Sequence, residues 1–110
     1  MSVRVEKADL PAEIANRGAG FLLTSIMDSR PHAAHLSFEI AMEGDQVEIR
    51  MPAGRTSYGN VKMQPSVTLL WPSPEPSDYS LIVDGEARVD GDSHVIVTVV
   101  GAVLHRPASA

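Results

Sequence analysis

The residues best suited to chemistry lie in a short cationic window near the middle of the chain. Between residues 49 and 74 there is no Asp or Glu, although the chain of 110 residues carries a formal net charge of −5. The window contains Arg50, Arg55, Thr56 and Ser57. A guanidinium group forms two parallel hydrogen bonds with a phosphate, and hydroxyl groups donate to its oxygens. This composition favours a small anion site, with a phosphate group as the anion.

The sequence around this window predicts a strand that turns into a short helix. We expect the strand over residues 46–51 and the helix over residues 55–64, which Pro65 ends. The first turn of a helix exposes backbone N–H groups and partial positive charge, and both attract anions. In the alternative interpretation, Thr56 or Ser57 only caps the helix and the cations are solvated. No glycine-rich nucleotide-binding motif decides between the two.

The elements that must position this window are mostly strands. A first helix is expected over residues 9–18, because Asp9 can cap it and Gly18 follows its last turn. Alternation of apolar and polar residues and the turn signals between them predict six strands, over residues 20–27, 32–42, 46–51, 66–71, 78–90 and 93–105. Gly85 is expected to mark a bulge. Six strands with two short helices favour an all-β protein, a closed or nearly closed antiparallel barrel.

The last predicted strand indicates an oligomer. Residues 95–104 are apolar at odd and even positions alike, apart from Thr98 and Gly101. Because side chains of a strand alternate between its two faces, both faces must be covered. A small barrel covers only the inner face, so we expect a second copy of the chain to cover the outer one in a homodimer. The alternative cover is the N-terminal helix.

Composition excludes several classes of protein and site. The acidic balance, with pI near 5.2 and five aromatic residues in all, argues against nucleic-acid binding. Cysteine is absent, which excludes disulfides and thiol catalysis. His32 and His35 would point to opposite faces of a strand, so no metal site is expected. No apolar leader or membrane-spanning run is present, which favours a soluble, cytoplasmic protein with one domain over residues 1–110.

A series of short segments, taken in order, carries a family resemblance. The segments are GFLLTS at residues 20–25, SRPH at 29–32, a Gly-Asp hairpin at 44–45, GRTSYGN at 54–60, QPSVTLLW at 64–71 and DGEARV at 84–89. Together they resemble the FMN-binding split-barrel superfamily, also called pyridoxamine 5′-phosphate oxidase-like proteins, from about residue 10 to residue 107. The resemblance implies a six-stranded antiparallel split β-barrel that dimerises, with flavin at the interface between the subunits.

The resemblance also assigns roles to residues of this sequence. It implies that the second strand lies along the flavin, and that its ring and ribityl chain are lined by His35, Leu36, Ser37, Phe38 and Glu39. It implies that the cofactor phosphate is held by Arg50, Arg55, Thr56, Ser57 and Asn60. The last assignment agrees with the anion site that charge and turn chemistry favour without it.

Three functions remain open at this point. The first is an oxidoreductase that uses FMN, or the deazaflavin F420, on a small-molecule substrate. The cofactor would carry the hydride chemistry, and no side chain stands out as a catalytic acid or base. The second is a non-catalytic cofactor- or ligand-binding module that has lost flavin binding. The third is a chain that only dimerises.

Overall fold

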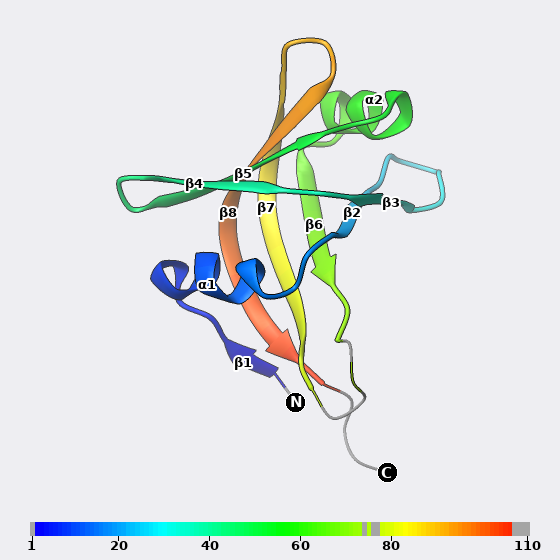
Figure 1. Ribbon diagram of the computed structural model, residues 1–110. Coiled ribbons are helices and arrows are strands. Elements are labelled where there is room, and N and C mark those ends of the chain that lie inside the picture. The colour runs from blue at the N-terminus through cyan, green and yellow to red at the C-terminus, as the bar shows by residue number, and fades with distance from the viewer. Residues whose placement is uncertain (1, 74, 76–77, 107–110) are drawn as a thin grey trace.

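A computed structural model describes residues 2–73, 75 and 78–106 (Figure 1). These residues form one antiparallel sheet with two short α-helices, α1 (Leu10–Ala15) and α2 (Arg55–Met63), and a 3₁₀ turn at Lys7–Asp9. The strands are β1 (Ser2–Arg4), β2 (Gly20–Thr24), β3 (His32–Leu36), β4 (Glu39–Glu43), β5 (Gln46–Pro52), β6 (Ser66–Trp71), β7 (Ser80–Asp90) and β8 (His94–His105). The predicted all-β class with two short helices is confirmed.

The strand order explains how this sheet becomes a barrel. It runs β3-β2-β6-β7-β8-β5-β4, and β1 pairs with β8 beside this path. The two strands at its ends, β3 and β4, are consecutive in the chain and are separated only by Ser37 and Phe38. Two residues span less than about 10 Å, so the sheet must curl until its ends meet. We call this junction, residues 37–38, the seam.

The structure differs from the prediction of six strands in two places. The predicted strand over residues 32–42 is divided at the seam into β3, which pairs with β2, and β4, which pairs with β5. The side chains alternate between exposed and half-buried without interruption from residue 31 to 40. Alternation reports which face a residue occupies and not which strand it pairs with, so it could not reveal the division. The second difference is β1, a short polar segment without such a pattern.

The predicted bulge at Gly85 is confirmed. Asp84 lies opposite Gly101 and Gly85 opposite Val99, so Val100 is an extra residue in β8. A Cβ atom at Gly85 would lie 2.4 Å from Cγ1 of Val97 and 2.6 Å from the carbonyl oxygen of Thr98. The backbones therefore approach closely at a position that only glycine fits.

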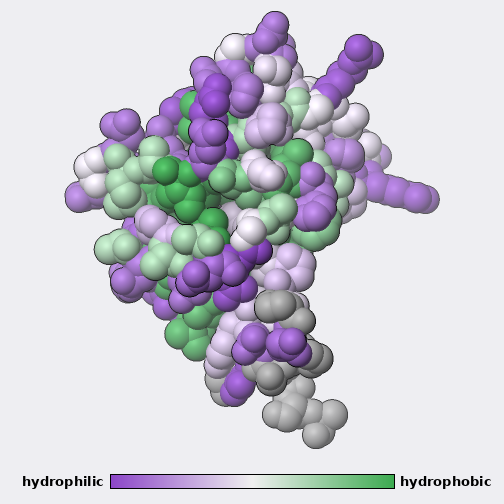
Figure 2. All heavy atoms as spheres, viewed as in Figure 1, coloured by the Kyte–Doolittle hydropathy of each residue, from purple (hydrophilic) through white to green (hydrophobic). Residues whose placement is uncertain are grey.

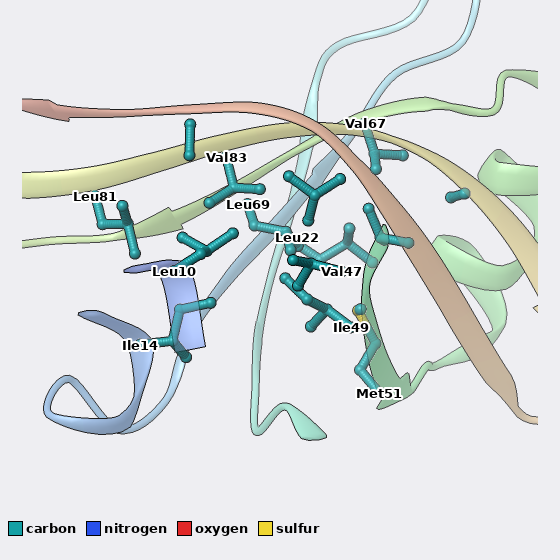
Figure 3. Close-up of a cluster of buried hydrophobic side chains, with 14 of the residues drawn as sticks. Leu10, Ile14, Leu22, Val47, Ile49, Met51, Val67, Leu69, Leu81 and Val83 are labelled. Carbon is teal, nitrogen blue, oxygen red and sulfur yellow. The ribbon is translucent and has the colours of Figure 1, made fainter. Parts of the chain in front are cut away.

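Both helices contribute to the barrel core. Figure 3 shows the two residues of α1, Leu10 and Ile14, within this cluster. Leu10 and Ile14 of α1 and Val61 of α2 belong to the same buried cluster as Leu69 and Trp71. Figure 1 shows α1 and α2 at opposite ends of the barrel. Burying these apolar side chains is the main free-energy gain that holds the helices against the sheet.

The N-terminal helix, which was the alternative cover for the outer face of β8, does not lie on that face. The two buried residues of α1 join the inner core, so α1 does not supply the outer cover. Val100, the extra residue of the bulge, remains 64% exposed. Within the single chain the described residues thus leave apolar surface on the outer side of the last strand.

Candidate functional site

The predicted anion site lies where two turns of the chain meet. The helix α2 begins at Arg55, as predicted, after Gly54 in an extended conformation. The backbone N–H of Ala53 donates to the carbonyl oxygen of Ser93 at 2.8 Å. The hydroxyl of Tyr58 donates to the carbonyl oxygen of Gly91. These two hydrogen bonds hold the β5–α2 turn (residues 52–58) beside the β7–β8 turn (residues 90–94), and we call this region the corner.

The first turn of α2 presents two of the predicted residues to solvent. Arg55 and Thr56 are exposed, and Arg55 makes no ion pair with any described residue. Gly54 occupies the position before the helix, without a side-chain cap. The cap that the alternative interpretation expected from Thr56 or Ser57 is therefore wrong, whereas the exposed Arg55 agrees with its solvated cations. Ser57 is 1% exposed and points into the protein, so it does not share the exposed side of this turn.

Arg50 has acidic neighbours that the sequence window did not show. Its Nε atom lies 3.1 Å from Oδ2 of Asp90, at the end of β7. In the pairing of β4 with β5, Arg50 also lies directly opposite Glu39. A segment free of Asp and Glu along the chain is thus not free of them in space, because adjacent strands supply the carboxylates.

The predicted flavin segment is divided between the two sides of the seam. His35, Ser37 and Glu39 are exposed and form a line on the outer face of the sheet. This line ends on the side of the corner, because Glu39 pairs with Arg50. Leu36 and Phe38 are half-buried and pack against the core. The structure therefore places His35, Ser37 and Arg50 along one outer line and Leu36 beneath it.

Asn60 is committed to a different contact. Its Nδ2 atom donates to the hydroxyl of Thr24 on β2 at 3.0 Å. Thr24 is only 2% exposed, so this bond joins the buried side of α2 to the barrel. Hydrogen bonds between buried polar groups are costly to lose. Asn60 and Ser57 thus lie on the side of α2 that faces the barrel, apart from Arg55 and Thr56.

Two contacts near the predicted site were not expected from the sequence. The ring of Phe21 stacks on His35, with centroids 4.8 Å apart and planes inclined by 20°. The ring of Phe38 packs against Trp71 at 4.9 Å. The β2–β3 pairing places Phe21 and His35 opposite each other, and only knowledge of that register could have found the first pair.

An apolar groove of about 510 Å³ opens beside the seam. Its lining combines α1 and its C-terminal loop with the seam and β4, and includes Ile14, Ser37, Phe38, Ile40 and Met42. Figure 2 shows the apolar side chains that gather over β4 and α1 on this face. No charged residue lines the groove. Arg50, Arg55 and Thr56 do not line this groove.

A row of half-buried apolar side chains crosses the outer face of the sheet. The pairing registers place one residue from each of β8, β7, β6 and β2 directly beside the next, namely Val103, Ile82, Leu70 and Phe21. Arg4 flanks the row on β1 and His35 flanks it on β3. We call these four apolar residues the outer row. Their buried neighbours along each strand, such as Leu69 and Leu81, face the core, so the outer row points away from it.

Sequence comparison finds relatives without an assigned function. No protein-family model matches the chain. Uncharacterized proteins of Mycobacterium bovis and Mycobacterium tuberculosis are each 41% identical over 69 residues, which is 57% of this chain and 48% of the relative. The chain thus spans about half the length of the curated relatives it matches.

Comparison of structures identifies the fold. An FMN-binding protein from Syntrophomonas wolfei superposes with a TM-score of 0.68 at 14% identity, over 94% of this chain and 86% of its own. A putative pyridoxamine 5′-phosphate oxidase from Listeria innocua gives 0.64 at 17%, over 89% and 96%. An F420 reductase gives 0.54 at 20%, over 77% and 86%. The chain has the fold of the FMN-binding split-barrel superfamily, and the resemblance predicted from the sequence is confirmed for the fold.

Two other kinds of feature are absent from the described residues. No helix there has the length and apolar character that a membrane crossing requires. No group of three or more His, Asp or Glu side chains in the described ranges is arranged to hold a metal ion.

Proposed function

We propose that this protein binds FMN by its phosphate at the corner and acts as a flavin-dependent oxidoreductase on a small molecule. The observation that carries the proposal is Arg55, an exposed cation without an acidic partner among the described residues, in the first turn of α2. The free N–H groups of this turn add hydrogen-bond donors and partial positive charge. These groups fit a phosphate.

The remaining predicted residues take different parts in this site. Arg55 and Thr56 contact the phosphate, and Arg50 borders it on the side of β5. His35 and Ser37, on the exposed line, contact the ribityl chain and ring, while Leu36 supports them from the core. Ser57 and Asn60 position α2 from its buried side. When bound, the flavin supplies the hydride chemistry, and the chain binds and orients it.

A homodimer is part of the proposal. The outer row presents four neighbouring, half-buried apolar side chains on the outer face of the sheet. Exposed apolar rows flanked by polar residues mark association surfaces, and a second copy of the chain is the simplest self-complementary cover. His35 lies at one end of the outer row, so a partner seated on the row would border the flavin site.

F420 in place of FMN is the second candidate, and the similarity to an F420 reductase favours it. A binding module without catalysis is the third. It is favoured by the pairing of Arg50 with Asp90, which leaves Arg55 as the one unpaired arginine of the corner among the described residues. The cofactor that binds separates these candidates.

The test is a titration of the purified protein with FMN and with F420, followed by flavin or deazaflavin fluorescence. We expect Arg55→Ala to weaken binding of the phosphate-bearing cofactor by roughly 1.5–3 kcal/mol, the value of a charge-assisted hydrogen bond. Lys7→Ala is the control, because it removes one positive charge beside α1, at the other end of the barrel. Equal affinities of the two variants would contradict the proposed site.

A further inference from the structure

We propose that Asp90 competes with the phosphate of the bound ligand for Arg50, and so sets how tightly the site holds it. This inference rests on the proposed function. It concerns a carboxylate that no sequence pattern connected with the site, on a strand forty residues beyond the arginine it contacts.

The contact can be exchanged for another partner. The side chains of Arg50 and Asp90 are 43% and 47% exposed, so water reaches both groups. Exposed ion pairs contribute little net stability, because each group is nearly as well solvated alone. A phosphate carries more negative charge than a carboxylate and accepts paired hydrogen bonds from a guanidinium group. Arg50 can therefore exchange Asp90 for a phosphate at small cost to the fold.

The turn that carries Asp90 is attached to the corner. Tyr58, one turn into α2, donates to the carbonyl oxygen of Gly91, the residue after Asp90. On the other side, Ala53 donates to the carbonyl oxygen of Ser93 at 2.8 Å. Because the two bonds attach this turn to residues on either side of Arg55, the carboxylate of Asp90 stays close to the anion site.

Arg55, within the corner, and Arg50, beside it on β5, have unequal surroundings. Arg50 faces Glu39 across the β4–β5 pairing and Asp90 from β7. Arg55 has no ion-pair partner among the described residues. A phosphate arriving at the corner thus finds one free cation, and it gains the second only by displacing Asp90. Removing that carboxylate should free Arg50 for the ligand.

The same turn provides a matched control. Asp92 is exposed, lies two residues from Asp90 and makes no ion pair in the described part of the chain. Asp90→Asn and Asp92→Asn each remove one negative charge from the turn while keeping side-chain size. General electrostatic attraction changes nearly equally in the two variants, but only Asp90→Asn releases Arg50.

The experiment measures the dissociation constant for FMN in the wild type, both Asn variants, Arg50→Ala and the double variant Asp90→Asn with Arg50→Ala. We expect Asp90→Asn to bind about tenfold more tightly than the wild type and Asp92→Asn about twofold, whereas Arg50→Ala should bind more weakly than the wild type because it leaves Asp90 uncompensated beside the phosphate. The double variant should lose the gain of Asp90→Asn. Asp90→Ser, which also removes the carboxylate, replaces Asp90→Asn should the latter fail to fold.

Each outcome decides the inference. Equal affinities of Asp90→Asn and Asp92→Asn would overturn it, and so would a gain that persists in the double variant. In either case, loss of binding in Arg55→Ala would leave the proposed function standing. If no variant binds FMN although circular dichroism shows them folded, the proposed function fails and the inference fails with it.

Discussion

The inner and outer faces of β7 and β8 differ in what their side chains contact. On the inner face, Leu81, Val83, Val95 and Val97 are fully buried among other apolar residues. On the outer face, pairs of polar side chains connect neighbouring strands, for example the hydroxyl of Thr68 with Oδ1 of Asp84 at 2.7 Å. The same two strands therefore combine a non-directional apolar contact with a set of directional polar ones.

This difference indicates where the molecule can change partners. Burial of the inner face supplies most of the free energy of folding, and any change of volume there is costly. The outer pairs include Arg88 with Glu48 at 3.0 Å and Arg50 with Asp90 at 3.1 Å, and both lie at the solvent boundary. Exposed pairs contribute little to stability, so the outer face can exchange them for a ligand or a second subunit.

The largest expected loss of stability comes from a substitution on the inner face of β6. Leu69 is fully buried and Leu70, its neighbour on the same strand, is half-buried in the outer row. We expect Leu69→Ala to lower the free energy of unfolding by about 2–5 kcal/mol, because it removes buried contacts and leaves a cavity. Urea denaturation measures this effect, and Leu70→Ala should cost clearly less. A larger loss of unfolding free energy in Leu70→Ala than in Leu69→Ala would contradict this difference between the two faces.

A smaller loss of stability is expected at the bulge, where the side chains of β8 change from one face of the sheet to the other. At Gly85 an added Cβ would overlap Val97 and the backbone of Thr98, so Gly85→Ala should cost about 1–3 kcal/mol through overpacking. Gly101→Ala is the control, since nothing lies within 4 Å of a Cβ atom at that position. Thermal unfolding of the two variants gives the comparison. A stable Gly85→Ala protein would mean that the strands can move apart at the bulge.

The smallest effect on folding is expected in the outer row. Ile82→Ser should change the unfolding free energy of the separate chain by less than about 1 kcal/mol, because Ile82 is only half-buried there. In the proposed dimer this residue lies within the interface, so sedimentation should show the variant dissociating at concentrations where the wild type is dimeric. Arg88→Ser, elsewhere on the outer face, should leave association unchanged. A wild-type monomer at micromolar concentration would contradict the dimer.

Much of the fold could be predicted because its signals are local. The strand Ser66–Trp71, the start of α2 at Arg55 and the bulge at Gly85 all agree with the structure, and each follows from neighbouring residues. The division of β3 from β4 could not be predicted. It depends on which strands pair, and the alternation on either side of Ser37 is the same.

The candidate site shows the same limit more strongly. Charge and turn residues were enough to indicate the turn before α2. The contact of Arg50 with Asp90 and that of Tyr58 with Gly91 join residues 40 and 33 positions apart, and no spacing in the sequence records them. Ser57 was expected beside Thr56 at the phosphate, but one residue turns a helix by about 100°, which places its side chain inside the protein.

Val100 has a consequence for comparing this chain with others. Val100 is an insertion in β8 relative to β7. The buried positions of β8 are therefore odd-numbered from Val95 to Val99, whereas the buried residue beyond Val100 is the even-numbered Ala102. An alignment with a homologue that lacks the additional residue needs a gap at this position. Without the gap, every position from 101 to the end of the strand would be matched to one on the opposite surface, and solvent-facing substitutions would be mistaken for changes to the interior.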